Sequence, residues 1–341
     1  MRYVVPGVRP FRHELGTCLF SVFGTLLLHR GGNVGLSLGA GWDFTYPRAG
    51  IAAEEYYVPT IGESVAEAVL VEQGVTSEWS WTDDADEGWR RWRDRVLTGE
   101  PAVLAVDNYH LPFRPAFHDV HTNHLLVAYG VDDDAEVAFV LDATPPRYQG
   151  PVSSVALRAA CNSGNPRAGD RDLFFTGSPI RNRQLIVSFS DAPWTPSAAW
   201  VRAVIGRNLH RLLAPPVTPG VCRGIEGMYE VAKHVESAGD RRACDDLFVF
   251  SGSVLSQRAL HAVFLREAAR RIGRHELLAH ARSMDAIAHQ WAALRVLTSR
   301  EVRERPESAY HRTAERLRRI AEAERVAARR LAAMDEWATP Q

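Results

Sequence analysis

A long apolar run that follows a cysteine constrains the fold of this chain more than any other feature of the sequence. Residues 19–28 read LFSVFGTLLL, and large apolar side chains recur there at the three-to-four spacing of a buried helix. Two glycines, Gly31 and Gly32, follow and predict its end. Cys18 would lie in the first turn, where unpaired N–H groups and the helix dipole favour a thiolate. Cys18 is therefore a candidate nucleophile, although cysteine is also a common small core residue.

The composition limits the classes of protein to which such a helix can belong. The chain has 341 residues, 46% of them hydrophobic, which is enough for two domains. Its 40 basic and 41 acidic residues give a formal net charge of -1, so we expect no nucleic acid partner. The four cysteines lack the spacing of a metal site and predict free thiols. Because neither a signal-peptide pattern nor an apolar run of about 20 residues occurs, we expect a cytoplasmic protein without a membrane segment.

The pattern along the chain changes from strands to helices near residue 193. Short apolar runs that end at polar or turn residues predict strands at 101–107, 124–131, 136–142 and 184–190. Amphipathic patterns predict helices at 62–75, 83–98, 197–213, 224–237, 242–248, 257–272, 275–298 and 305–337. We therefore predict an α+β protein with two domains. In residues 1–193 the N-terminal helix packs on an antiparallel sheet, and residues 194–341 form an all-α domain.

Three residues with the chemistry of a thiol-dependent site follow one another in the N-terminal domain. Cys18 begins a helix, His124 begins a predicted strand, and Asp142 ends the next one. An acidic turn joins the two strands, so antiparallel pairing would place His124 and Asp142 at the same end of the sheet. A nucleophilic thiol needs a base and a group that orients the base. This order is that of a papain-like, cysteine-peptidase-type domain, and we predict a Cys18, His124 and Asp142 triad. Taken singly, the histidine could be a core residue and the aspartate a turn cap.

Two other local patterns suggest different chemistry. His118, His121 and His124 lie at a spacing of three with Asp119 nearby, which could be a metal cluster. Prolines in that loop argue against a helix that would bring the imidazoles to one face, so we expect no metal. Residues 34–46 are rich in glycine but lack the Lys-Ser/Thr of a phosphate loop. We interpret them as a segment of close backbone approach that lines a site.

Several stretches resemble the butirosin-biosynthesis acyltransferase family. In the N-terminal domain these are GAGWDFTY at 39–46, VDNYHLPFRP at 106–115, HTNHLLVAYGVDD at 121–133 and VLD at 140–142. Two further segments are similar to the helical domain usually fused to that family, FSGSVLSQR at 250–258 and FLREAA at 264–269. The resemblance implies a papain-like N-terminal domain followed by a helical one.

What this resemblance implies about activity is acyl transfer, or amide-forming cyclisation of a carrier-bound substrate, in natural-product assembly. Cys18 would take an acyl or peptidyl group from the phosphopantetheine thioester of a carrier protein and pass it to a small-molecule amine. The chain would then need no cofactor of its own. The helical domain would dock the carrier through arginines such as Arg258 and Arg266, or would form a homodimer. Candidate substrate contacts lie in the matching motifs, with Asn108 also a candidate oxyanion donor: Trp42, Tyr46, Asn108, Tyr109 and His121.

Three other functions stay open at the level of the sequence. A cysteine peptidase or amidase would use the same triad without a carrier protein, but no glutamine upstream of Cys18 supplies the usual oxyanion donor. An inactive relative could serve as a scaffold in a synthetase complex, with an unreactive thiol. A metal-dependent hydrolase would instead use the histidine cluster.

Overall fold

The structure is a computed structural model that describes residues 1–49, 73–164, 166–174, 179–190, 194–215 and 217–334. These residues form two compact units. Unit 1 contains residues 1–33 and the described residues of 75–189, and unit 2 contains residues 34–49, 73–74 and the described residues from 190 onward. Our division at residue 193 thus differs from the structure for residues 34–49, which belong to the helical unit. The helix expected at 62–75 falls almost entirely outside the described residues.

Unit 1 is built on a seven-stranded sheet whose strand pairs are antiparallel. Along the sheet the order is β3 (Val75–Ser80), β8 (Gln184–Phe189), β4 (Ala102–Asp107), β5 (Asn123–Asp132), β6 (Val137–Asp142) and β7 (Tyr148–Ser153). The short strand β1 (Arg2–Val4) pairs with the later part of β5. All four strands expected from the sequence are present. Strands β1, β3 and β7 were not expected, and β7 carries Gly150 and Pro151, which only an edge strand tolerates well.

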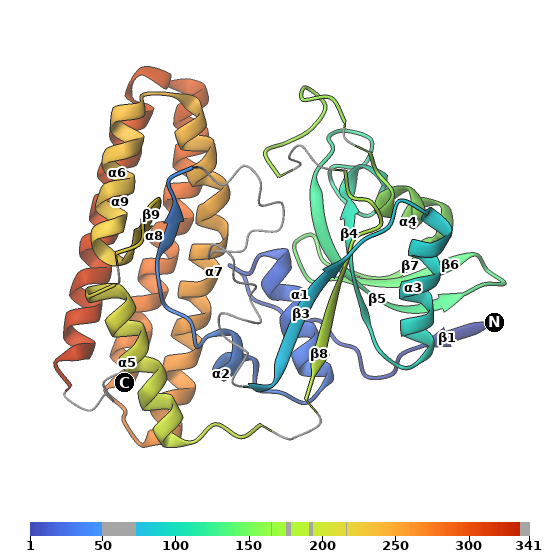
Figure 1. Cartoon of the computed structure of the whole chain (residues 1–341), viewed down its shortest axis with the longest axis horizontal. Helices are drawn as coiled ribbons and strands as arrows, with labels where there is room; N and C mark the ends of the chain where they lie inside the picture. Colours follow the sequence, from blue (N-terminus) through green and yellow to red (C-terminus); the bar gives the residue numbers. More distant parts are fainter. Residues whose placement is uncertain (50–72, 165, 175–178, 191–193, 216, 335–341) are drawn as a thin grey trace. The chain divides into compact units, whose positions relative to one another are not determined.

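Helices cover both sides of this sheet. Figure 1 shows α1 (Cys18–His29) on one side of the strands, and α3 (Ala85–Leu97) with α4 (Ser154–Cys161) on the other. Ten of the residues of α1, Cys18–Leu27, are buried. Gly24 is needed there, because a Cβ at this position would lie 2.3 Å from the ring of Phe11. The prediction of an α+β fold with an N-terminal helix on an antiparallel sheet is confirmed, and this arrangement is compatible with a papain-like domain.

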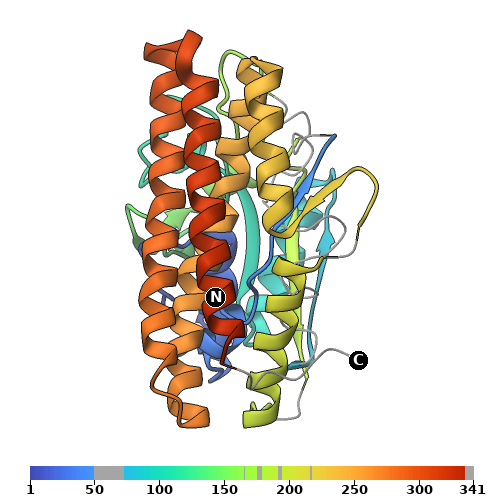
Figure 2. The same cartoon turned by 90° about the vertical axis from the view of Figure 1, so that its left-hand side faces the viewer.

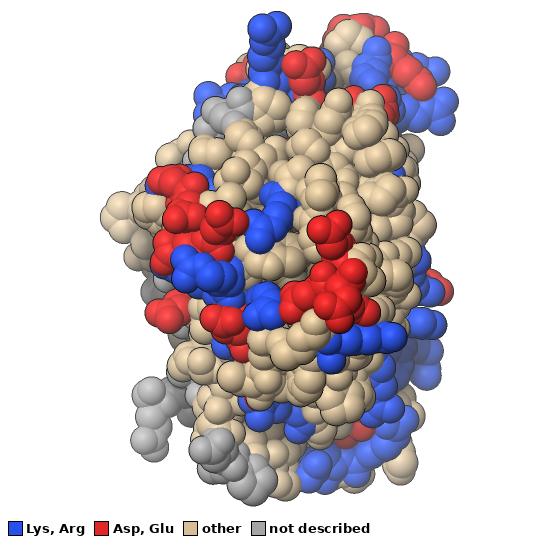
Figure 3. Space-filling model, turned by 90° about the vertical axis from the view of Figure 1, so that its right-hand side faces the viewer, with Lys and Arg blue, Asp and Glu red and all other residues tan. Residues whose placement is uncertain are grey.

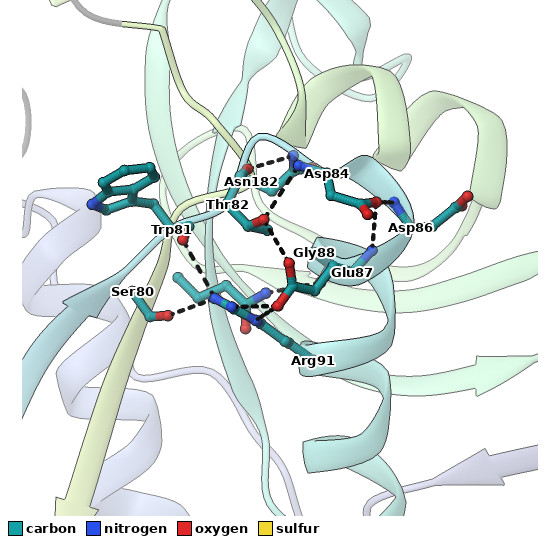
Figure 4. Close-up of polar contacts among 10 residues, drawn as sticks. Ser80, Trp81, Thr82, Asp84, Asp86, Glu87, Gly88, Arg91 and Asn182 are labelled. Atoms are coloured by element: carbon teal, nitrogen blue, oxygen red, sulfur yellow. Dashed lines mark hydrogen bonds and ion pairs between the residues drawn. The ribbon is translucent and has the colours of Figure 1, made fainter.

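Polar side chains fix the start of α3 (Figure 4). Asp84 is the N-cap, and its Oδ1 accepts hydrogen bonds from the backbone N–H groups two and three residues later, at 2.9 and 3.0 Å. Glu87 accepts from the Thr82 hydroxyl at 2.9 Å and from Arg91 Nε at 3.1 Å. Asn182, just before β8, donates to the Thr82 carbonyl at 3.1 Å. These bonds tie the first turn of α3 to the segments that enter β8 and leave β3.

Unit 2 is helical. Its long helices run side by side in Figures 1 and 2: α5 (Ala198–Leu213), α6 (Gly224–Ala238), α7 (Arg241–Ile272), α8 (Leu277–Glu304) and α9 (Pro306–Ala332). Residues 34–49 add α2 (Val34–Leu38) and β2 (Thr45–Pro47), and β2 pairs with β9 (Val221–Arg223). This pairing across the sequence explains why the early segment belongs to unit 2.

Helix α7 is continuous where the sequence predicted two helices separated by residues 249–256. The intervening serines satisfy their hydroxyls within the helix, since Ser251 donates to the Phe248 carbonyl at 2.8 Å and Ser256 to the Gly252 carbonyl at 3.0 Å. Its length and composition would allow α7 to cross a membrane, but 89% of its most apolar window is buried inside the protein. Burial against other helices therefore outweighs the weak helix propensity of residues 249–256, and α7 is a core helix of unit 2.

A buried polar network joins α7 and α9 in unit 2. The guanidinium of Arg258 donates to both carboxylate oxygens of Glu324, at 3.0 and 2.8 Å, and both side chains are 0% exposed. The indoles of Trp42 and Trp291 donate to the same carboxylate at 3.1 and 2.8 Å. The expectation that Arg258 docks a carrier protein is therefore wrong, because its guanidinium is fully enclosed and paired. Arg266 is partly exposed and forms an ion pair with Asp285.

Candidate active site

Cys18 is the first residue of α1, and Thr17 is its N-cap in an extended conformation. The helical ladder begins with the Ser21 N–H, which donates to the Thr17 carbonyl at 2.9 Å. The helix itself therefore gives no partner to the N–H groups of residues 18–20. The first turn of α1 carries no acidic side chain. Negative charge on the Cys18 sulfur, or on an oxygen bound beside it, is thus favoured by the helix dipole.

His124 lies at the start of β5 and Asp142 at the end of β6, and their side chains are hydrogen-bonded. His124 Nε2 is 2.8 Å from Asp142 Oδ2, and both residues are buried. The two strands are antiparallel neighbours, with Val127 opposite Leu141, which brings these strand ends together. Cys18 lies close enough to the His124 ring for its side chain to raise the pKa of His124. Since Nε2 faces Asp142, Nδ1 is the ring nitrogen left for the sulfur. The structure thus pairs His124 with Asp142 and places Cys18 near the His124 ring.

Electrostatics favour a charged imidazole at this site. Burial alone would lower the pKa of His124, but the charge and hydrogen bond of Asp142, followed by those of Cys18, raise it to about 9. Burial would likewise raise the pKa of Asp142, but the charge and hydrogen bond of His124 and the charge of Arg114 hold it below its ordinary value. An imidazolium next to a thiol stabilises the thiolate, which is the nucleophilic form.

Arg114 is a site residue that the sequence analysis did not single out. Its Nη1 donates to Asp142 Oδ2 at 2.9 Å and to the carbonyls of Thr144 and Pro146 at 3.2 and 3.4 Å. The Thr144 N–H donates to the other Asp142 oxygen at 3.0 Å. Both oxygens of Asp142 are therefore held, one of them by two donors. Arg114 is 28 residues from Asp142 in the sequence, so only the fold reveals the contact.

Replacing Arg114 with methionine is expected to slow alkylation of Cys18 roughly 10-fold and to shift the acid limb of its pH profile to higher pH. The physical reason is that the Arg114 charge helps to keep Asp142 ionised. The rate of Cys18 alkylation measured from pH 4 to pH 8 gives this limb. Arg114→Lys should recover part of the shift, whereas Arg147→Met, which removes an exposed arginine, should leave the limb in place. If the acid limb of the alkylation profile is unchanged in Arg114→Met, Arg114 contributes to packing and does not help to keep Asp142 ionised.

Three of the predicted substrate contacts, Asn108, Tyr109 and His121, lie at or beside a second Asp–His pair in unit 1. His121 Nδ1 is 2.5 Å from Asp107 Oδ2, and the same oxygen accepts from the Ser163 hydroxyl at 2.6 Å. The Tyr109 ring stacks on the His121 ring, with centroids 4.1 Å apart. Asn108 is buried, and its side-chain oxygen has no hydrogen-bond partner among the described residues. Its role as an oxyanion donor stays a prediction.

The histidines at a spacing of three do not form one cluster. His118 stacks on Phe117, with ring centroids 3.9 Å apart, whereas His124 is bonded to Asp142. His121 is instead grouped with Asp107 and His110. The loop between β4 and β5 is not helical over these positions, so a constant spacing does not place the side chains on one face.

Trp42 and Tyr46, the other predicted substrate contacts, belong to unit 2 and are 1% and 2% exposed. The Trp42 indole is bound to Glu324, and Tyr46 lies in β2 with its ring edge-on to Phe250. Gly39, in the same segment, lies so close to α7 that a Cβ would be 2.3 Å from the Leu260 carbonyl. The close backbone approach that we inferred for residues 34–46 is present. We assign Trp42 and Tyr46 to the packing of the helical unit in place of substrate binding.

Charges on the surface are mixed in sign. Acidic and basic side chains lie beside one another over the face drawn in Figure 3. Ion pairs of unit 1 show the same mixing, for example Arg93 with Asp133 and Arg158 with Asp86, each at 2.7 Å. The absence of a nucleic acid partner remains a prediction.

Two parts of the chain match known families. Residues 17–143 match the family described as butirosin biosynthesis protein H, N-terminal. Residues 256–331 match a domain of unknown function (DUF4872). No curated protein matches the chain. The first match contains Cys18, His124 and Asp142, and the second lies within α7, α8 and α9.

Proposed function

We propose that this chain, which belongs through residues 17–143 to the family of butirosin biosynthesis protein H, is a cysteine-dependent acyltransferase of natural-product biosynthesis. It would take an acyl or peptidyl group from a carrier-protein thioester and deliver it to an amine. The observation that supports the proposal is the hydrogen-bonded pair of His124 and Asp142, with Cys18 at the start of α1 close enough to raise the pKa of His124.

In the first step the Cys18 thiolate attacks the thioester carbonyl. A new C–S bond forms to Cys18, and the C–S bond to the phosphopantetheine breaks, so that the carrier leaves as a thiol after taking a proton from the His124 imidazolium. The step exchanges one thioester for another and is close to balanced in energy. Unpaired N–H groups at the start of α1 are suitable donors to the oxyanion that forms in between.

In the second step an amine attacks the acyl group on Cys18. His124 takes the proton of the amine, the C–N bond forms, and the sulfur of Cys18 leaves. The acylated sulfur carries no charge, so one of the causes that raise the pKa of His124 disappears while burial still lowers it. His124 is thus a stronger acid before acylation and a more available base after it. The amide product is more stable than the thioester, which drives the transfer.

Intact-protein mass spectrometry tests the proposal. Incubation with an acylated carrier protein should add the mass of the acyl group, and addition of an amine should remove it with formation of the amide. Release of the free acid in place of the amide would identify a hydrolase. A chain that takes no acyl group from any of a panel of acyl and peptidyl carrier thioesters would contradict covalent transfer.

The hydrogen-bonded pair of His124 and Asp142 is expected to make the folding stability of the protein depend on pH. The pKa of His124 is about 9 in the folded protein and 6.5 ordinarily, so its contribution is complete below about pH 6.5 and is lost as the pH rises through 9. We expect the free energy of unfolding to fall by an amount on the order of 1–3 kcal/mol over this window. Urea unfolding of the wild type and of His124→Gln at pH 6, 7.5 and 9 measures this fall in the free energy of unfolding. An equal decline in both proteins would show that other groups cause the loss.

Partners follow from the proposed chemistry. The carrier protein brings its own phosphopantetheine, so the enzyme needs no bound cofactor for the two steps. The cytoplasm, where carrier-protein assembly takes place, is the location that we propose. Docking of the carrier and formation of a homodimer remain alternatives for the role of unit 2.

A further inference from the structure

We propose that Asp107, His110 and His121 form a site for a divalent transition-metal ion of the zinc class, at the base of the loop that joins β4 to β5. One donor atom of each residue lies within 4.8 Å of the others. A carboxylate with two imidazoles is a donor set that zinc binds well, and a fourth position stays open. The site is separate from the candidate active site, and neither step of the acyl transfer requires it.

The carboxylate of Asp107 is already fixed as metal ligands usually are. Asp107 is 0% exposed, and its Oδ1 accepts from the backbone N–H groups of Tyr109 and Thr122 at 3.0 and 3.2 Å. Its Oδ2 accepts from the Ser163 hydroxyl at 2.6 Å. Such surrounding hydrogen bonds orient a ligand and raise the affinity for the ion.

The two imidazoles suit the same purpose. The His110 ring lies beside the His121 ring, with centroids 6.1 Å apart. Metals bind imidazole in its neutral form. His121 Nδ1 and Asp107 Oδ2 are 2.5 Å apart, and a hydrogen-bond proton lies between them. An ion at about 2.0–2.2 Å from each donor would replace this proton, and the two atoms would move apart to roughly 3 Å.

The position of the three residues gives the ion a structural task. Asp107 ends β4, His110 ends the short 3-10 helix Asn108–His110 that follows β4, and His121 lies just before β5, 14 residues after Asp107. Metal bonds among them would clamp the two ends of the intervening loop. Arg114 lies in that loop and holds Asp142, so the ion would stabilise the segment that orients the base.

Titration with Zn²⁺ by isothermal calorimetry tests the site. Cys18→Ala protein without an affinity tag is the right background, because the Cys18 thiol and His124 could bind zinc themselves. We expect one ion per chain, with a dissociation constant on the order of 1 μM or below. Co²⁺ should give the visible absorption of a tetrahedral complex, and Zn²⁺ should displace it.

Variants in the same background separate this site from other histidines. His110→Ala should weaken binding by about 100-fold or more, and Ser163→Ala by about 10-fold. His118→Ala is the matched control from the same loop and should bind as the parent does. Circular dichroism and the thermal midpoint without metal verify that each variant is folded. The proposal is overturned if the folded parent shows no saturable binding up to about 1 mM Zn²⁺, or if folded His110→Ala binds as tightly as the parent.

Discussion

Cys18→Ala is expected to take up no acyl group and to form amide at least roughly 10³-fold more slowly than the wild type. The reason is that both proposed steps pass through a bond to the Cys18 sulfur, which alanine lacks. Any residual rate would come from binding the thioester and the amine side by side, since the N–H groups at the start of α1 remain. Intact mass and chromatography of the amide give the two readouts on one sample.

Cys161→Ala is the matched control for this substitution. Cys161 belongs to the same unit and is buried, and burial raises the pKa of its thiol to about 12, so it is a poor nucleophile. We expect this variant to form the adduct at close to the wild-type rate. An adduct that persists in Cys18→Ala and disappears in Cys161→Ala would place the nucleophile elsewhere and would end the proposed mechanism.

Asp142→Asn is expected to lower the acylation rate by roughly 10³-fold while the fold is retained. The charge of Asp142 is the main cause that raises the pKa of His124 against burial, so its loss lowers that pKa and favours the neutral imidazole. The amide also fits poorly. If its oxygen faces His124 and Arg114, its NH₂ group meets the Thr144 N–H, which now donates to Asp142. Both effects make His124 less able to stabilise the Cys18 thiolate.

Alkylation by iodoacetamide at about pH 6 is the most direct readout for Asp142→Asn, because it reports the thiolate without any carrier protein. We expect fast modification of Cys18 in the wild type and slow modification in the variant. Asp134→Asn, at a side chain that is 88% exposed, should behave as the wild type does. Slow alkylation in all three proteins would favour a scaffold without a reactive thiol.

Local patterns in the sequence were sufficient for the elements that carry the proposed chemistry. The apolar period after Cys18 gave α1, and the short apolar runs around residues 101–142 gave β4, β5 and β6. The hairpin turn between β5 and β6 then placed His124 and Asp142 at one end of the sheet. These inferences hold because each depends on side-chain periodicity or on a short connection, and both are fixed by near neighbours in the chain.

The predictions from the sequence were wrong where burial, or contacts between residues far apart in the chain, determine the structure. The sequence predicted separate helices at 242–248 and 257–272, but α7 is one continuous buried helix in which Ser251 and Ser256 bond to backbone carbonyls. Arginine is usually exposed, yet Arg258 is enclosed because Glu324 reaches it from α9. Trp42 was assigned to the substrate on the basis of a motif, but it is bound by that same carboxylate.

The sequence by itself determined the class of the fold, the order of the main strands and helices, and the three residues proposed for catalysis. Only the tertiary structure decided that Arg114 holds Asp142 and that His121 pairs with Asp107. It also decided that residues 34–49 belong to the helical unit. The physical reason is the range of the interactions. Periodicity and turns act over a few residues, whereas ion pairs and strand pairing join positions that only the folded chain brings together.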